Sequence, residues 1–479
     1  MTTTIRPDAT AAAASSAIAI AREFALDGEV VSARPYGSGH INDTYLVETT
    51  TTTTTTTSGD GDGDGDGDGD GDGDGDGDGD GDGDGDAQDG EDDDDDDATA
   101  NNAPSSSSSS SSSSDVARRD DGTRRHYYVL QRINRDVFKR PDLVMENVAR
   151  VCDHARSRLL ESGVHDADRR ALRLVPTTTT TGDGGGDGCP DDDGSGTRRP
   201  SWHVVDGSGE YWRCYRRVPN ATGHDVASST DRARSAAMAY GHFQSLLADL
   251  PPPPGEERRR LLHETIPGFH DTPRRFETFR SAIADDVLGR APSASAEIEF
   301  ALARERDSSV LVDALRRGTI PERVAHNDAK MGNVLLDDDT DAGVCVVDLD
   351  TVMPGTVLYD FGDLVRTCTS PAPEDEIDLS KVRMRFEVFE ALVDGYLEST
   401  RDFLTETERS MMPFSGKLIT FEIGLRFLTD YLEGDSYFKV DRPGHNLDRA
   451  RAQFRLVESI EEQMPEMQAH VDGYARVAR

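Results

Sequence analysis

The chain has 479 residues, a formal charge of -40 and only 35% hydrophobic residues. This acidic balance excludes the broad basic surface that a nucleic-acid binder or a protein docked on an anionic membrane would need. The five cysteines are scattered and form no C-x-x-C pair, so neither a disulfide framework nor a zinc site is indicated.

The charge is concentrated in a low-complexity insert at about residues 50–125. From Gly59 to Asp97 it contains 22 acidic side chains and no basic one, including fourteen consecutive Gly-Asp dipeptides. Such a segment has no apolar residues from which to build a core, and we interpret it as a hydrated spacer. A second Thr/Gly/Asp-rich insert covers residues 177–200. About 380 residues remain, enough for one large bilobal domain or two ordinary ones.

The basic residues are almost all arginine, 47 of 52. Together with the many aspartates, this suggests a cytoplasm of high salt, where screening removes the self-repulsion of an acidic surface. The alternative is a GC-rich genome with expanded simple repeats. Unfolding measured against KCl separates the two explanations. The segment Met1–Leu26 has no uninterrupted apolar run near 18 residues and resembles an amphipathic helix, so a cytoplasmic protein is expected.

The N-terminal part is predicted to be rich in strands. Strands are expected at Val30–His40, Ile41–Glu48 and His126–Ile133, separated by a glycine turn and by the first insert. The first insert is therefore an expanded hairpin loop. The second insert lies between Leu172–Pro176 and Trp202–Asp206, which predicts another hairpin. Long loops are tolerated at such positions because the entropy of loop closure grows only slowly with length.

The remaining elements complete an α+β fold with two lobes. A helix is predicted over Pro141–Leu160, a strand over Glu210–Val218, and mainly helices from Thr230 onward. One strand pair recurs at Asn333–Asp337 and Val344–Asp348. The expected division is a small β-rich lobe over residues 1–218, containing both inserts, and a larger helical lobe over residues 219–479, with a ligand cleft at their junction.

The chemistry is concentrated in one loop, His326-Asn327-Asp328-Ala329-Lys330-Met331-Gly332-Asn333, followed 15 residues later by Asp348-Leu349-Asp350. This order matches the H-x-D-x-x-x-x-N catalytic loop of phosphotransferases with a metal-binding aspartate on the next strand. Phosphoryl transfer needs a carboxylate to accept the proton of the acceptor hydroxyl, and oxygen ligands to hold Mg²⁺ against the phosphates of the nucleotide.

The motif assigns a role to each polar residue. Asp328 is the predicted base, and Lys330 is expected to reach the transferring phosphate. Asn333 and Asp348 are the predicted Mg²⁺ ligands. Asp360 is interpreted as a buried residue that orients the catalytic loop, with direct metal binding as the alternative.

At this point the chain resembles the aminoglycoside phosphotransferase and choline kinase superfamily, which has a protein-kinase-like fold. Within it, the sequence is most similar to N-acetylhexosamine 1-kinases. The resemblance spans nearly all of the non-repetitive chain. It rests on Tyr36–Tyr45, Val129–Asn134, Leu262–Thr272, His326–Asn333, Val347–Gly355 and Phe421–Tyr431.

The resemblance implies a nucleotide site on the β-rich lobe. Gly37 and Gly39 would lie in the nucleotide loop, where missing Cβ atoms let backbone N–H groups approach phosphate. Kinases of this type next offer a strand lysine paired with a helix glutamate, but this chain has no lysine there. Arg132 and Glu146 are the candidates for that pair, with a solvent-facing Arg132 as the alternative. Residues 212–218 would be the hinge beside adenine, or else an ordinary core strand.

The resemblance also implies an acceptor site formed by His40, Asp328, Arg426 and Tyr437. Arginine and tyrosine suit a polyhydroxy acceptor because they donate hydrogen bonds in fixed directions. Arg426 could instead pair with Glu422 or Asp430, each one helical turn away.

The expected activity is transfer of phosphate from ATP, with Mg²⁺, to the anomeric hydroxyl of an N-acetylhexosamine or a close hexose. One alternative is another acceptor of the superfamily, namely an aminoglycoside, homoserine or choline. The other is a kinase-like binding protein with weak or no catalysis. The expected partner is a small-molecule sugar, and the expected state is a monomer or weak homodimer.

Overall fold

A computed structural model describes residues 7–37, 41–52, 123–178, 201–252 and 261–477. By its internal contacts the chain divides into two compact units, Met1–Thr52 with Asp115–Arg479, and Thr53–Ser114. Both predicted lobes fall in the first unit, and the boundary near residue 218 stays a prediction. Most of both inserts, together with the predicted site residues Gly39 and His40, lies outside the described residues.

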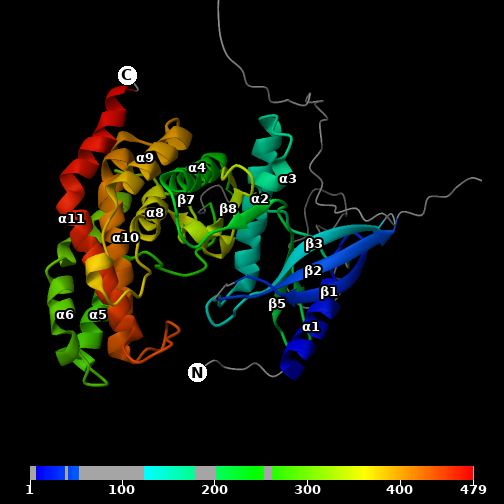
Figure 1. Ribbon diagram of the computed structural model, residues 1–479, viewed down its shortest axis with the longest axis horizontal. Coiled ribbons are helices and arrows are strands. Elements are labelled where there is room, and N and C mark those ends of the chain that lie inside the picture. Colours follow the sequence, from blue (N-terminus) through cyan, green and yellow to red (C-terminus); the bar gives the residue numbers. More distant parts are fainter. Residues whose placement is uncertain (1–6, 38–40, 53–122, 179–200, 253–260, 478–479) are drawn as a thin grey trace, which may run out of the picture. The chain divides into compact units, whose positions relative to one another are not determined.

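The N-terminal part is a five-stranded antiparallel sheet in the order β1-β2-β3-β5-β4 (Figure 1). Alternating apolar residues such as Val47 and Leu130 form a core, which the helix α1 (Pro7–Ala21) covers with Ala17 and Ala21. The strands are β1 Glu29–Pro35, β2 Asp43–Thr52, β3 Thr123–Arg132, β4 Val204–Val205 and β5 Tyr211–Arg216.

The expected hairpin around the first insert is confirmed, and its strands run further than predicted. β2 and β3 pair continuously as far as Thr52 and Thr123, so residues on both flanks of the insert belong to the ladder. The β-branched threonines extend the strand because they suit a pleated surface. The prediction that the insert begins at residue 50 and ends at residue 125 was therefore three residues too wide at each side.

The second predicted hairpin is not formed as expected. Leu174 makes an isolated bridge to Tyr215, while Val204 pairs with Trp212 of β5. Both flanks therefore pair with β5 or lie beside it, and not with each other. The ends of the insert are nevertheless adjacent, since the Thr177 amide donates to the Ser201 carbonyl at 2.9 Å.

The rest of the chain is mainly helical, as predicted from Thr230 onward, and α2 confirms the helix predicted after the first hairpin. The α-helices are α2 Pro141–Glu161, α3 Ala167–Arg170, α4 Thr230–Leu246, α5 Thr272–Asp285, α6 Ser295–Leu302, α7 Val310–Arg317, α8 Val357–Thr369, α9 Phe386–Thr400, α10 Glu406–Glu433 and α11 His445–Val477. The 3-10 helices are η1 Ala291–Ala294, η2 Glu305–Ser309, η3 Met331–Asn333, η4 Leu349–Thr351 and η5 Leu379–Lys381.

Large apolar side chains hold these helices together. Phe361, Phe389, Tyr396 and Phe421 are buried in one continuous core, in which α4 packs on α9 and α10 packs on α11 (Figure 1). Each phenyl ring buried in this way contributes roughly 2–3 kcal/mol. Among the described residues, no helix is both long enough and apolar enough to cross a membrane.

Two small sheets lie within this helical region and carry the predicted motif. β8 (Val334–Asp337) pairs with β9 (Gly343–Val346) and with β6 (Ala221–Gly223), which confirms the predicted strand pair. β7 (Arg323–Ala325) pairs with β10 (Met353–Gly355). An N-terminal antiparallel sheet followed by a helical region with these strand pairs is the protein-kinase-like α+β fold that was expected.

Candidate active site

The predicted catalytic loop runs from the end of β7 to the start of β8, and a buried carboxylate fixes its beginning. Asp360, on the first turn of α8, accepts hydrogen bonds from the backbone amides of His326 at 2.8 Å and Asn327 at 2.7 Å. The Thr351 hydroxyl donates to the His326 carbonyl at 2.8 Å. The interpretation of Asp360 as the residue that orients the loop is confirmed, because both of its oxygens are engaged by loop amides.

Two polar side chains of the loop converge on the Asp328 carboxylate. Lys330 Nζ lies 2.8 Å from Asp328 Oδ2, and Asn333 Nδ2 donates to the same oxygen at 2.9 Å. Burial alone would raise the pKa of Asp328, but the charge and hydrogen bond of Lys330, with His326 and Arg366 beyond it, hold that pKa below its ordinary value. Asp328 is therefore an anion at neutral pH and can accept a proton.

Asp348 follows β9 and lies next to this loop. The Val347 amide donates to the Asn333 carbonyl at 2.9 Å, which brings the two predicted metal ligands together. Asp348 itself has a left-handed backbone with φ of 60°. Desolvation by the surrounding protein, with repulsion from Asp350 and Asp328, raises the pKa of Asp348 to about 6. The side chain is nevertheless exposed, and solvent therefore screens this effect.

These donors fit a magnesium ion that also binds a nucleotide. The Asp348 carboxylate makes no hydrogen bond or ion pair within the described part of the chain. The side-chain nitrogen of Asn333 donates to Asp328, which leaves the side-chain oxygen Oδ1 of Asn333 as a ligand. No group of three or more His, Cys, Asp or Glu residues that could hold a metal occurs among the described residues. One or two protein oxygens completed by phosphates and water is the usual environment of Mg²⁺.

The structure does not bring the predicted nucleotide residues Arg132 and Glu146 together. Arg132 forms an ion pair with Asp43 on the neighbouring strand, and its side chain is 44% exposed. Glu146 lies 2.8 Å from His263. The solvent-facing alternative for Arg132 is the observed one. Gly37 has a positive φ of 78°, a conformation that favours glycine, and its contact with phosphate stays a prediction.

A buried arginine that the sequence interpretation missed lies on β5 of the N-terminal sheet. Arg213 of β5 is fully buried, forms an ion pair with Asp350, and donates from Nε and Nη2 to Gln131 Oε1 at 3.0 and 2.9 Å. One signal was available in the sequence, since a single charge interrupts the apolar strand Tyr211–Tyr215. Trp212, predicted as part of a hinge, is buried in the sheet core, and adenine contact stays a prediction.

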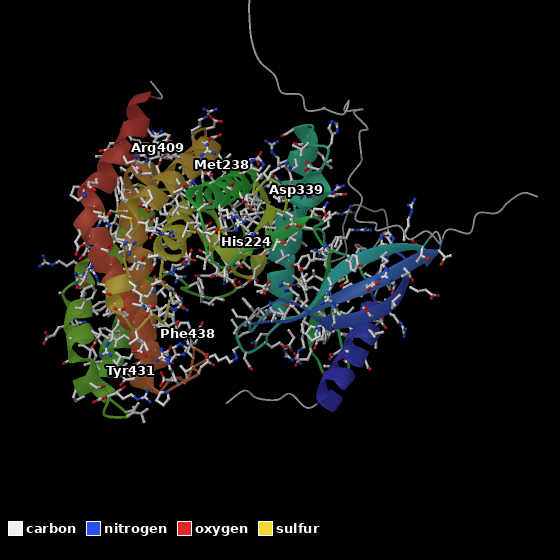
Figure 2. All side chains as sticks on the ribbon, in the orientation of Figure 1. His224, Met238, Asp339, Arg409, Tyr431 and Phe438 are labelled. Carbon is white, nitrogen blue, oxygen red and sulfur yellow. The ribbon has the colours of Figure 1, made fainter. Side chains whose placement is uncertain are left out.

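On the acceptor side, Arg426 of α10 lies among aromatic rings. Its guanidinium carbon is 5.3 Å from the ring centre of Phe269, 5.7 Å from that of Tyr437 and 5.5 Å from that of Phe438. Figure 2 labels Phe438 on the segment that follows α10. Arg426 Nη2 also lies 3.5 Å from the Tyr437 hydroxyl, and Tyr437 is 62% exposed. Arg426 and Tyr437, two of the predicted acceptor residues, are therefore neighbours.

The alternative partners of Arg426 are engaged elsewhere. Glu422 accepts a hydrogen bond from Thr272 at 2.6 Å and lies 2.8 Å from His270 Nδ1. Asp430 accepts the amides of residues 436–438 and the side-chain amide of Asn446. Because both carboxylates have other partners, the described residues offer Arg426 no direct ion pair.

Phe269 and His270 connect this aromatic cluster to the catalytic loop. His270 Nε2 lies 3.2 Å from the Asn327 carbonyl, one residue before Asp328. Arg275 of α5 donates to the Phe269 carbonyl at 3.2 Å, and its buried Nε has no hydrogen-bond partner among the described residues. Burial and the nearby charge of Arg426 lower the pKa of Arg275. Two guanidinium groups therefore lie close together on the acceptor side.

A cavity among the described residues lies elsewhere. It has a volume of about 340 Å³ and is lined mainly by apolar residues of α2, α4 and β9, including Val151, Phe243 and Val344. None of the predicted site residues lines it. The candidate active site is therefore defined by its converging polar groups and not by this cavity.

Comparison with known families supports this arrangement. Residues 108–392, more than half of the chain, match the family described as "Phosphotransferase enzyme family" (APH). The chain belongs to this family. It is therefore a small-molecule phosphotransferase of the ATP-dependent type, and the match includes Asp328, Asn333, Asp348 and Asp360.

Solved structures of similar proteins come from related families at low identity. A microcompartment-associated aminopropanol kinase is 18% identical with a TM-score of 0.42, and the match covers 72% of this chain and 87% of that one. A choline/ethanolamine kinase family protein from Mesorhizobium loti is 15% identical with a TM-score of 0.37, covering 72% and 86%. A spectinomycin phosphotransferase in complex with ADP and spectinomycin is 10% identical with a TM-score of 0.39, covering 71% and 86%.

Proposed function

We propose that this phosphotransferase is a sugar 1-kinase, which transfers the γ-phosphoryl group of ATP to the anomeric hydroxyl of an N-acetylhexosamine or a related hexose. The observation that carries the proposal is the arginine and aromatic cluster beside the catalytic loop. Arg426, with Tyr437, offers directed donors to a neutral polyhydroxy acceptor. Aromatic rings such as Phe269 and Phe438 suit the apolar face of a sugar ring.

The charge of this cluster favours a sugar over the cationic acceptors of the superfamily. Arg275 and Arg426 both lack an ion-pair partner among the described residues. An ammonium group of choline or of an aminoglycoside placed beside them would be repelled. This argument does not weigh against homoserine, whose carboxylate would be attracted.

The residues of the loop suggest how the transfer proceeds. The anionic Asp328 accepts the proton of the sugar hydroxyl. The hydroxyl oxygen attacks the γ-phosphorus, and the bond between that phosphorus and the ADP oxygen breaks. Lys330, whose side chain is 42% exposed, would neutralise charge on the transferring group. Asn333 and Asp348 would hold Mg²⁺, which offsets charge on the phosphates when bound. The products are a sugar 1-phosphate and ADP.

One observation favours the second candidate, a kinase-like binding protein with weak catalysis. The strand lysine is missing, and Arg132 does not take its place because it pairs with Asp43 at the surface. Such a protein would bind nucleotide with little or no turnover.

One assay tests both candidates. Nucleotide consumption is measured in molar KCl with ATP and Mg²⁺ against N-acetylglucosamine, N-acetylgalactosamine, galactose, glucose, choline, homoserine and kanamycin, and phosphorus NMR identifies the product. An anomeric sugar phosphate is the expected result. Turnover with choline or kanamycin but not with any sugar would refute the sugar assignment, while nucleotide binding without turnover would favour the binding protein.

A further inference from the structure

Arg213 is fully buried. Among the largest fully buried side chains of the described residues, it is the only charged one. A buried guanidinium costs several kcal/mol unless it is paired and hydrogen-bonded. Arg213 meets this need through Gln131 of β3 and through Asp350, which is itself 4% exposed. This pair joins two strands of the N-terminal sheet to the Asp348-Leu349-Asp350 segment.

Asp350 has a second partner, which comes from the glycine turn. Asn42 Nδ2 donates to Asp350 Oδ2 at 2.6 Å, while Arg213 contacts the other oxygen, Oδ1. The Asn42 side chain is fixed in turn, because its Oδ1 accepts the Asn134 amide at 2.9 Å. Asn134 Nδ2 donates to the Ile41 carbonyl at 3.1 Å. The end of the turn that begins near Gly37 is thus tied to Asp350.

We propose that Arg213, Asp350 and Asn42 are positioning residues that hold the start of β2 and the metal-binding aspartate at a fixed separation, and so prepare the site for the nucleotide. Asp350 differs in role from Asp348, two residues before it. Both Asp350 oxygens are engaged by protein groups, whereas the Asp348 carboxylate makes no hydrogen bond or ion pair among the described residues. The two acids of the D-x-D motif therefore have different roles in this proposal. Asp348 would bind the metal, and Asp350 binds Arg213 of β5 and Asn42.

The clamp also accounts for the missing strand lysine. On β3, where kinases of this type offer the lysine, this chain has Gln131. Its side chain orients Arg213 and carries no charge of its own. The charge that links the sheet to the catalytic region comes from β5 instead. Arg213 and Asp348 are close enough for their charges to interact. The inference rests on ATP as phosphoryl donor but not on the identity of the acceptor.

A charge swap tests the clamp. Asn42→Asp keeps the acceptor for the Asn134 amide but places two carboxylates against each other. Losing a hydrogen bond to a charged group in this way is expected to weaken binding of a non-hydrolysable ATP analogue with Mg²⁺ by roughly 10- to 100-fold. The double variant Asn42→Asp/Asp350→Asn restores an amide beside a carboxylate at this contact but removes the ion-pair partner of Arg213, so it is expected to regain only part of that loss. Isothermal titration calorimetry measures both without any acceptor.

A matched control separates positioning from stability. Arg304→Lys weakens a two-contact pair with Glu461, at 3.0 and 2.7 Å, which joins α11 to the end of α6. It is expected to lower the melting temperature without changing analogue affinity. The clamp variants should instead change affinity more than melting temperature, and should raise hydrogen exchange of the amides in residues 41–46.

Two results would overturn the proposal. Analogue affinity that is unchanged in Asn42→Asp while the melting temperature falls would show a purely structural contact. Loss of Mn²⁺ binding in Asp350→Asn, measured by electron paramagnetic resonance, with unchanged affinity for metal-free nucleotide, would make Asp350 a metal ligand. A wrong acceptor would affect neither measurement, so failure of the sugar proposal is distinguishable from failure of this one.

Discussion

The catalytic loop and the acceptor side differ in how completely their polar groups are satisfied. Around Asp328, contacts of 2.7–2.9 Å join the side chains of Lys330, Asn333 and Asp360 to the loop. Among the described residues, the Arg426 side chain has one hydrogen bond, which is 3.5 Å long and goes to an exposed tyrosine. The phosphoryl-transfer groups are preorganised before any ligand binds, whereas the acceptor groups keep capacity for a partner. The comparison predicts that selectivity for the acceptor lies on α10 and the segment after it.

The largest effect is expected from breaking the preorganised side at Asp328. Asp328→Asn keeps the size of the side chain but cannot accept the proton, so turnover should fall by about 10²- to 10⁴-fold. Steady-state kinetics give the turnover, and calorimetry with an ATP analogue checks that nucleotide affinity is retained. Turnover near that of the unchanged protein would remove Asp328 from the role of base.

Asp348→Asn is expected to cause the next largest loss of activity. In the absence of metal it is expected to raise stability at high pH. Loss of a metal ligand should lower turnover by roughly 100-fold or more, since a metal contributes several kcal/mol of charge stabilisation. The folded-state pKa of about 6 lies above the ordinary 3.8, so the folded chain binds this proton more tightly than the unfolded chain does. The stability that this proton contributes is therefore lost as pH rises from about 4 through 6.

The measurement is thermal unfolding in the absence of metal at pH 8 and pH 5. Asp348→Asn should melt above the unchanged protein at pH 8, and the difference should shrink at pH 5, where the carboxyl group of the unchanged protein is already largely protonated. An equal difference at both pH values would contradict the raised pKa.

The acceptor side should respond more weakly and in a different constant. Arg426→Met removes directed donors from the acceptor and is expected to raise the KM for the sugar by roughly 10- to 100-fold, with the KM for ATP unchanged. Tyr437→Phe, which removes one exposed hydroxyl, should raise the sugar KM only about twofold to fivefold. A rise in the KM for ATP alone would place Arg426 on the donor side and reverse the comparison.

The smallest effect is expected from the insert. Replacing residues 53–122 by Asn-Gly connects the paired Thr52 and Thr123 through a two-residue turn that suits a hairpin. Turnover should stay within about twofold, and the free energy of unfolding should rise by no more than about 3 kcal/mol, because the entropy of loop closure grows only with the logarithm of loop length. A collapse of turnover in a variant that still unfolds cooperatively would show that the insert takes part in catalysis.

Local patterns predicted much of this fold. The helix over Pro141–Leu160 and the strand pair around Asn333 and Asp348 were predicted correctly, because helical spacing and apolar strand runs are properties of neighbouring residues. The second hairpin was wrong for the complementary reason. Leu174 and Val204 both lie near β5, and a third strand that competes for partners is invisible in the two flanks alone.

The residues of the candidate site were likewise predicted only in part. Asp360 was correctly interpreted as the residue that orients the loop, since its motif stands a short distance from the loop in sequence. The network of Arg213 was missed because Arg213, its partners Gln131 and Asp350, and Asn42 come from four separate segments of the chain. Arg132 was offered as the substitute for a lysine by its position on β3, but side chains alternate across a strand, and the neighbouring Gln131 is the one that faces the buried charge.

The left-handed backbone at Asn327 and Asp348 has a consequence for how freely these positions can change. Their φ values are 64° and 60°, a region in which asparagine, aspartate and glycine are tolerated and β-branched residues are strained. Variation at both positions is therefore restricted by conformation as well as by chemistry. In a saturation library sorted first for folded protein and then for turnover, asparagine and glycine at position 348 should pass the first sort and fail the second, whereas valine and isoleucine should already be depleted in the first.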